Sequence, residues 1–283
     1  MRGAGQRAGE ALLALPLAAF FAVFFAAPLG VLVGLSLFAE PEMRTPSLAQ
    51  YAKFLGDPFH LSILWGTLWL GAKATLLCLL LGYPVAWVAA RAPARWQSAL
   101  VFVVILPILT SVVVRTFSWI VILGRQGVLN RIALGLGLTD EPVRLLYTEG
   151  GVILVLAQVQ MPLMVLPLLT ALTRIDPTLA DASAALGAGA WRTFWRVTLP
   201  LSIPGLVAGC ILTYAGCVTA FITQTLIGGA RLIYMPLHIY QQVVGANDWP
   251  FAAAISVIFM VAVLVAVGVL NQLGRASRGA VDA

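Results

Sequence analysis

Long apolar runs alternate with shorter polar segments along the whole chain. Six such runs are found, at residues 11–38, 61–90, 97–123, 150–173, 201–227 and 250–273. A helix crosses the hydrocarbon layer of a membrane in about 20 residues, so each run is long enough to span it. The apolar residues are continuous rather than placed at every second position, which favours helices over the strands of a barrel. The pattern predicts an all-α polytopic membrane protein with six transmembrane helices and a single transmembrane domain over residues 1–283.

The composition agrees with this class of protein. Of the 283 residues, 61% are hydrophobic and 10% are charged, whereas soluble domains contain about 25% charged residues. The net charge of +6 comes from basic residues that are scattered singly, so we expect no nucleic-acid partner. The three cysteines lie inside apolar runs and are expected to be small buried side chains rather than metal ligands or disulfide partners. His60 and His238 are far apart in sequence, and two separate polar positions at helix ends are favoured over a shared site.

Lys and Arg residues are distributed unevenly between the two sides of the predicted membrane. An even number of crossings places both termini on one side, together with segments 91–96 and 174–200. That side holds nine basic residues, Arg2, Arg7, Arg91, Arg95, Arg174, Arg192, Arg196, Arg275 and Arg278. The opposite side holds six, Arg44, Lys53, Arg125, Arg131, Arg144 and Arg231. The positive-inside rule therefore predicts that both termini and the 174–200 segment are cytoplasmic.

The 174–200 segment is too polar and too regular to be a simple linker. Asp176 followed by Pro177 is typical of a helix start, and Gly187 can take the left-handed conformation that ends a helix. We expect one short helix over 177–186 and a second over 190–197, ended by Leu199 and Pro200. Two short helices would form a knob on the cytoplasmic surface; the alternative is an amphipathic loop that lies on the membrane, held by Arg192 and Arg196.

The sequence DASAALGAGAWRTFWRVTLP at 181–200 resembles the EAA coupling loop of ABC importer permeases. The consensus of that loop is E-A-A, three residues, Gly, nine residues, Ile, any residue, then Leu-Pro. The E-A-A positions are occupied here by Asp181, Ala182 and Ser183. Gly187 stands at the consensus glycine, Val197 at the isoleucine, and Leu199 and Pro200 at the final Leu-Pro. The resemblance implies a type I importer fold in which this cytoplasmic loop, between the fourth and fifth helices, docks on a separate ATPase subunit. Trp191 and Phe194 would add apolar contact to that interface.

Four further stretches, at 76–91, 112–130, 225–243 and 247–256, resemble permeases of the spermidine/putrescine branch of that family. The resemblance implies a bacterial inner-membrane location, a second permease subunit in a heterodimer, two ATPase subunits, and a periplasmic substrate-binding protein. No phosphate loop of the form G-x-x-x-x-G-K-[ST] occurs in the chain. We therefore expect no enzyme activity, cofactor or metal on this chain, with ATP and magnesium held by the partner ATPase.

The solute itself is less well defined by the sequence. Relatives of this type carry polyamines and related amines, opines or aminophosphonates, and a cation pathway should offer carboxylates or aromatic faces. The predicted helices contain no Asp or Glu; their charged residues are Lys73 and Arg115. Arg115 is expected either to bond carbonyl groups at a kink or to touch the solute. Lys73 is expected either to pair with a subunit or snorkel, or to contact an anion.

The candidate pathway residues are Lys73, Arg115, Trp119, Tyr214, Phe221 and Thr223. The three aromatic residues could receive an amine, or could simply pack between helices. If both cations face the pathway, an anionic or zwitterionic solute is the better hypothesis. An ion-coupled secondary carrier is a further alternative, and it predicts buried carboxylates and inverted repeats. An intramembrane enzyme needs a catalytic pair or a metal cluster within the helices, and none is evident.

Overall fold

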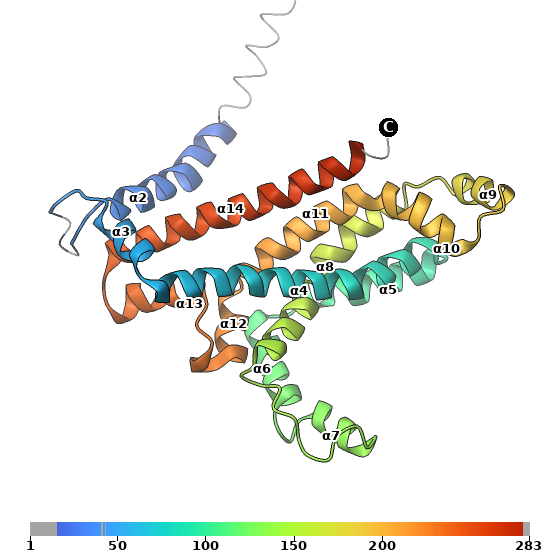
Figure 1. Ribbon diagram of the computed structural model, residues 1–283, viewed down its shortest axis with the longest axis horizontal. Helices are drawn as coiled ribbons and strands as arrows, with labels where there is room; N and C mark the ends of the chain where they lie inside the picture. Colours follow the sequence, from blue (N-terminus) through green and yellow to red (C-terminus); the bar gives the residue numbers. More distant parts are fainter. Residues whose placement is uncertain (1–15, 41, 43, 280–283) are drawn as a thin grey trace, which may run out of the picture. The chain divides into compact units, whose positions relative to one another are not determined.

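The computed structural model describes residues 16–40, 42 and 44–279, with side chains as far as residue 275. Regular structure in this part of the chain is helical, apart from an isolated bridge between Phe38 and Pro46. In chain order the elements are η1 Ala22–Ala26, α2 Ala27–Ser36, α3 Ala49–Gly56, α4 Pro58–Arg91, α5 Ala94–Leu109, α6 Val112–Leu123, α7 Val128–Gly135, α8 Glu149–Leu172, α9 Thr178–Ala185, α10 Ala190–Thr193, η2 Phe194–Thr198, α11 Leu199–Val218, α12 Phe221–Gly228, η3 Gly229–Arg231, α13 Met235–Tyr240, η4 Gln241–Gly245 and α14 Trp249–Gly279 (Figure 1).

Six helical segments of the described residues are long and apolar enough to cross a membrane. They are Pro16–Ser36, Pro58–Arg91, Val112–Gly135, Glu149–Leu172, Ala190–Val218 and Trp249–Arg275, and Ala94–Leu109 is a shorter apolar helix. The prediction of an all-α protein with six spans is therefore confirmed. The predicted first span begins at residue 11, and its residues 11–15, like Arg2 and Arg7, lie outside the described residues.

Two predicted spans are divided in the structure. The run at 97–123 becomes α5 and α6, because Thr110 and Ser111 take extended backbone angles, with ψ of 147° and 131°. The run at 201–227 becomes α11 and α12, separated at Thr219 and Ala220. A break inside a membrane leaves carbonyl groups without helical partners, and these need other donors.

Side chains supply those donors at both breaks. Arg115 Nη1 donates to the carbonyl oxygen of Pro107 in the last turn of α5. Gln224 Nε2 donates to the carbonyls of Cys217 and Val218 at the end of α11, over 2.8 Å and 3.2 Å. Each break is thus stabilised by a specific side-chain hydrogen bond from a residue that follows it in the chain. The hydrophobic pattern does not record such bonds and therefore did not reveal the breaks.

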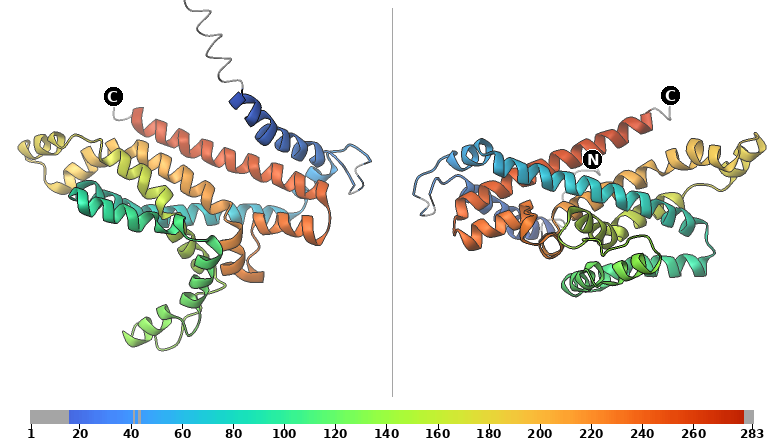
Figure 2. Two further views of the ribbon diagram at one scale, coloured as in Figure 1. Left: turned by 180° about the vertical axis from the view of Figure 1, so that it is seen from behind. Right: turned by 60° about the horizontal axis from the view of Figure 1, so that its bottom comes forward.

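The described residues form two compact units, the first within residues 16–61 and 238–261 and the second within 62–237 and 262–279. In the second unit α8 and α11 lie side by side (Figures 1 and 2). Gly205 and Gly209 of α11 face α8 so closely that an added Cβ would lie 2.5 Å from the Pro167 carbonyl oxygen and 3.0 Å from that of Met164. Small residues allow such approach in membranes, where packing rather than water expulsion drives association.

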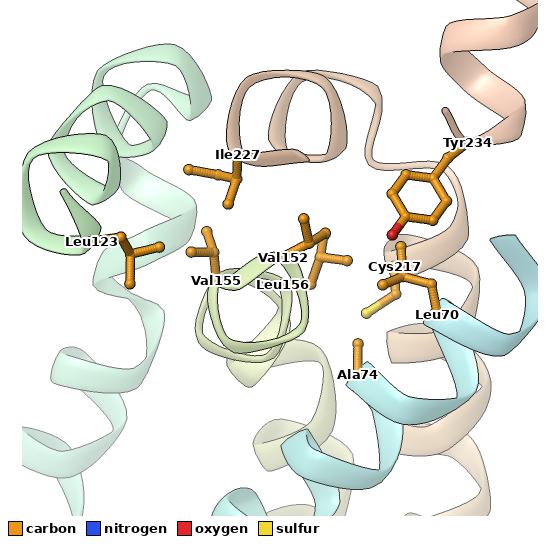
Figure 3. Packing of buried hydrophobic residues seen from close by; sticks show 9 residues of the cluster. All are labelled: Leu70, Ala74, Leu123, Val152, Val155, Leu156, Cys217, Ile227 and Tyr234. Carbon is orange, nitrogen blue, oxygen red and sulfur yellow. The ribbon is translucent and has the colours of Figure 1, made fainter. Parts of the chain in front are cut away.

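One of two buried clusters in the second unit surrounds the N-terminal half of α8. Its buried residues come from α4, α6, α8, α11, α12 and the segment before α13; they are Leu70, Ala74, Leu123, Val152, Val155, Leu156, Cys217, Ile227 and Tyr234 (Figure 3). Cys78, Cys210 and Cys217 are all buried free thiols, as expected from their apolar surroundings in the sequence.

The first unit contains an aromatic cluster around the two histidines. His60 Nδ1 and His238 Nε2 lie 3.0 Å apart, and both side chains are buried. The His60 ring stacks on Phe54 with ring centres 5.5 Å apart and meets the edge of Phe251 at 5.1 Å. The expectation of two separate polar positions was therefore wrong, because the fold brings the start of α4 against α13.

Candidate functional sites in the 174–200 loop and at the broken helices

The first short helix of the 174–200 loop is stabilised at both ends by its own sequence. Asp176 Oδ1 accepts a hydrogen bond from the backbone N–H of Thr178 over 2.9 Å, and hydrogen bonds from Thr178 lower the pKa of Asp176. The helix begins at Thr178, one residue later than predicted. At the other end Gly187 has φ of +79°, while Gly187 N–H donates to Ala184 O and Ala188 N–H to Ser183 O. This is the Schellman arrangement of a glycine-ended helix, so the predicted stop at Gly187 is confirmed.

The second short helix differs from the prediction. It does not end at Leu199 and Pro200 but continues through them, so that residues 190–218 form one helical run. Proline lacks an N–H, and its ring conflicts with the carbonyl four residues before it. The helix accommodates Pro200 by widening over η2, where Leu199 N–H donates to Phe194 O, five residues back.

The two short helices are tied to each other and to α4. The hydroxyls of Ser183 and Thr193 lie 2.9 Å apart. Phe194 meets Tyr83 of α4 edge to face at 5.7 Å, and the Tyr83 hydroxyl lies 3.0 Å from Ser202 Oγ of α11. The knob is therefore a folded element with defined contacts rather than an unstructured loop.

The outer surface of the knob is largely uncovered. Asp181 and Ala182 are exposed, Ser183 is half-buried, and no residue of α9 or α10 is buried. Leu186 is 89% exposed and Trp191 is 74% exposed, with Trp191 stacked on Phe194 at 6.0 Å. Apolar side chains so exposed outside the spans are typical of a surface that another protein or the membrane covers.

A polar cavity of about 410 Å³ lies between the knob, the C-terminal end of α4 and the N-terminal end of α5. Its lining includes Arg91, Gln97, Asp176 and Asp181, and it also includes Leu172 at the end of α8. The turn near residue 91 and the 174–200 loop therefore lie at the same end of the second unit. The opposite end of α8, at Glu149, lies on the other side of the span.

A second cavity, of about 530 Å³, lies where the two helix breaks meet. Three of the predicted pathway residues line it, namely Arg115, Phe221 and Thr223, and Gln160 and Thr219 add polar groups. Arg115 makes the carbonyl bond expected of a residue at a kink, while its Nε has no hydrogen-bond partner. Arg115 is the one charged residue among the residues that line this cavity.

Trp119 and Tyr214 are not part of this lining. Trp119 Nε1 donates to Gln158 Oε1 of α8 over 3.1 Å and packs against the core. Tyr214 is 5% exposed, and its ring lies beside Gly71, where an added Cβ would meet it at 3.1 Å. In this structure both residues pack between helices, which was the second of the two roles expected for the aromatic candidates.

Lys73 does not share partners with Arg115 and instead pairs with Glu149, the residue just before the predicted span at 150–173. Lys73 Nζ lies 2.8 Å from Glu149 Oε1, the first residue of α8. Thr148 caps this helix by accepting from Gly151 N–H over 3.2 Å. Threonine followed by glutamate before an apolar run is a helix-start signal, which could have moved the predicted boundary to Glu149.

The pairing also fixes the depth of Lys73. The 24 residues of α8 extend about 36 Å, enough to cross a hydrocarbon layer of about 30 Å. Lys73 lies level with the first residue of α8, and therefore at the edge of that layer rather than at its centre. The 34 residues of α4 extend about 51 Å, which lets the helix continue beyond this edge.

The sequence and the fold match known proteins over most of the chain. Residues 4–279 match the family described as the binding-protein-dependent transport system inner membrane component. The spermidine/putrescine transport system permease protein PotB of Salmonella typhimurium (strain SL1344) is 37% identical over 211 residues, covering 75% of this chain and 73% of that protein. The inner membrane ABC transporter permease protein YdcU of Escherichia coli (strain K12) is 31% identical over 280 residues, covering 93% and 88%. A solved bacterial ABC transporter involved in the import of the acidic polysaccharide alginate shares the fold, with a TM-score of 0.78, 19% identity and 96% coverage of both chains.

Proposed function

The chain belongs to the inner membrane components of binding-protein-dependent transport systems, and we propose that it carries a small organic amine as one of two permease subunits. Membership of this family makes the chain a multi-pass inner-membrane permease of an ABC importer and a non-catalytic transport component. The amine is supported by the relatives named for spermidine and putrescine transport, which are 37% identical over three quarters of the chain. This similarity is the single observation on which the choice of solute rests.

The partners that we propose are a second permease subunit, two ATPase subunits that bind ATP and magnesium, and a periplasmic substrate-binding protein. The surface proposed to dock on one ATPase is the knob, with Asp181, Ala182, Ser183, Gly187, Trp191, Phe194, Leu199 and Pro200 as its residues. The exposed apolar side chains of the knob and its ordered hydrogen bonds support this assignment. Docking on a cytoplasmic ATPase requires the knob, the turn near Arg91 and both termini to face the cytoplasm.

Closure of the ATPases on ATP would then push the knob and change the access of the solute pathway. Nucleotide binding can shift the inward–outward equilibrium only as far as the docked knob favours one of the two states. A chain that alternates access in this way needs no ionisable group for ion coupling. Among the described residues no Asp or Glu is buried, which disfavours the ion-coupled secondary carrier considered from the sequence.

A second candidate is an importer for a zwitterionic or anionic solute, and the cavity at the helix breaks favours it. Arg115 lines that cavity with an unpartnered Nε and with no acid among the lining residues. A carboxylate or phosphonate would satisfy such a group. The form of this idea in which Lys73 joins Arg115 has less support, because Lys73 is paired with Glu149.

The experiment has two parts. The chain is tagged in its own membranes and purified, and an associated ATPase is the expected result; a chain that purifies without any ATPase would overturn the importer assignment. The complex is then tested for ATP-dependent uptake of putrescine, in competition with a panel of amines, opines and aminophosphonates. Competition by simple diamines supports the first candidate, whereas competition only by acid-bearing compounds selects the second.

A further inference from the structure

Lys73 and Glu149 form an ion pair with unusual surroundings for a membrane-spanning chain. The two side chains are 37% and 44% exposed, so the pair is open on one side rather than enclosed in the core. Exposed pairs contribute little stability, and the energy that holds this one together is correspondingly small. A partner that offered Glu149 an equally good cation could therefore displace Lys73.

Aromatic side chains lie on the same stripe of α4 as Lys73. Trp65 and Trp69 precede it at intervals of four residues, which places the three side chains in one row along the helix. Trp69 is 53% exposed, and Lys73 Nζ lies 5.5 Å from the centre of its ring. This distance is within the range in which an ammonium group is attracted to an aromatic face. The ammonium group of Lys73 thus contacts both a carboxylate, from Glu149, and an aromatic ring, from Trp69. These are the two kinds of group that bind organic cations.

Glu149 has a fixed place at the capped start of α8. It lies in the first turn of α8, where the positive end of the helix dipole favours a carboxylate. The buried Tyr234 stands close enough that the negative charge of Glu149 adds to the effect of burial and raises the pKa of the tyrosine to about 12. The tyrosine remains neutral beside the acid and leaves the open side of the carboxylate to a cation.

We propose that Glu149 and Trp69 form an ammonium-binding site at the outer edge of the pathway, and that Lys73 occupies it when no solute is present. This inference rests on the proposed function and names the residues of the chain that would bind the amine. The side chain of lysine is a primary ammonium on four methylene groups, which is chemically one end of 1,4-diaminobutane. An incoming primary amine replaces Lys73 on Glu149 with the same hydrogen-bond geometry and the same aromatic neighbour.

The proposal predicts effects of opposite sign for the two members of the pair. Lys73→Met removes the internal competitor, so the dissociation constant for an amine falls; for an exposed pair the change is about two- to fivefold. Glu149→Gln removes the carboxylate, so the same constant rises about tenfold or more. A tie between two helices with no role in binding gives a different pattern, because removing either member then has the same effect.

The measurement is the binding of radiolabelled putrescine to the purified importer complex in nanodiscs without the periplasmic protein, so that the affinity of that protein does not mask the result. Lys53→Met is the matched control, since Lys53 belongs to another exposed ion pair, with Asp248 at 3.4 Å. It should leave putrescine binding unchanged. Trp69→Leu should weaken binding while Trp69→Phe retains most of it, and Trp65→Leu controls for loss of a membrane-anchoring tryptophan.

Tighter binding in Lys73→Met together with weaker binding in Glu149→Gln supports the proposal. Changes of the same sign in both variants, or equal losses in Trp65→Leu and Trp69→Leu, overturn it. Glu149→Asp keeps the carboxylate and should retain binding, which separates loss of the charge from failure to assemble. Absence of putrescine binding in the wild-type complex also overturns the proposed amine site. If such a complex still takes up another solute with ATP, the importer function stands without this site.

Discussion

Gly187 provides the sharpest test of the knob, because its conformation is required by the structure and its surroundings are empty. Its φ of +79° lies in the left-handed region, and an added Cβ would meet no atom within 4 Å. A substitution there therefore changes the backbone energy without creating a clash. A residue other than glycine in this region costs about 1–2 kcal/mol, whereas asparagine costs less because its short side chain can hydrogen-bond locally in this conformation.

The expected series follows from these energies. Gly187→Asn should be nearly silent, and Gly187→Ala should shift the balance between formed and unformed knob by about 5–30-fold. Gly187→Pro should abolish the motif, since proline fixes φ near −65° and removes the N–H that donates to Ala184 O over 2.9 Å. Gly189 provides a matched control in the same loop. Its φ of −70° suits any residue and it has equally open surroundings, so Gly189→Ala should have no effect.

The assay is ATP hydrolysis by the purified complex in nanodiscs, with and without the solute-loaded periplasmic protein, alongside ATP-dependent uptake. The stimulated rate should fall in the order glycine, asparagine, alanine, proline, while the amount of chain inserted in the membrane stays constant. Full stimulation and uptake in the Gly187→Pro complex would refute the coupling role of the knob. An equal loss in Gly189→Ala would show that the loop is sensitive to any substitution, and the energetic argument would then be wrong.

Two further predictions concern the helix break and the histidine pair. Arg115→Met leaves the Pro107 carbonyl without its donor, which costs about 1.5–3 kcal/mol, so the melting temperature of the complex should fall. Arg115→Lys keeps a donor and should recover part of the loss. An unchanged melting temperature in Arg115→Met would contradict the role of this bond. His238 is kept neutral because burial, and then His60, lower its pKa from 6.5 to about 4. Unfolding restores the higher value, so the unfolded chain binds the proton first and stability should decrease as the pH falls from 6.5 towards 4. Thermal unfolding across this range should show the decrease in the wild type and a smaller one in His238→Gln; equal slopes would exclude the histidine as the source.

The sequence predicted those features that the membrane itself imposes. A span must be long, apolar and helical, so the six spans follow from the hydrophobic pattern. The ends of α9 follow from local chemistry at Asp176 and Gly187, and these positions were predicted to within one residue. In both cases the determining interactions lie within a few residues of the position that they fix.

The features that the sequence missed depend on residues far apart in the chain. Lys73 and Glu149 are separated by 76 positions, and His60 and His238 by 178. The break between α11 and α12 involves residues closer in sequence and was missed as well, because nothing in the sequence marks Gln224 as the donor to carbonyls six and seven residues before it. Hydropathy records how apolar each segment is and carries no information on which side chains meet.

The continuity of the helical run through Pro200 changes how force from the knob can reach the solute. Had the second short helix ended at Leu199, the knob would have been joined to the membrane part by a flexible corner, and a push would have been lost in bending. Instead, the 29 residues of the run form a rod of about 44 Å from Ala190 in the knob to the break at Thr219, which lines the cavity with Arg115. The bond between Ser202 and Tyr83 fastens this rod to α4, the helix that carries Lys73. If the knob docks as proposed, its displacement would be transmitted to both candidate solute sites along these helices. At the widened turn η2 the hydrogen bonding of the rod changes, because Leu199 N–H donates to the carbonyl five residues back.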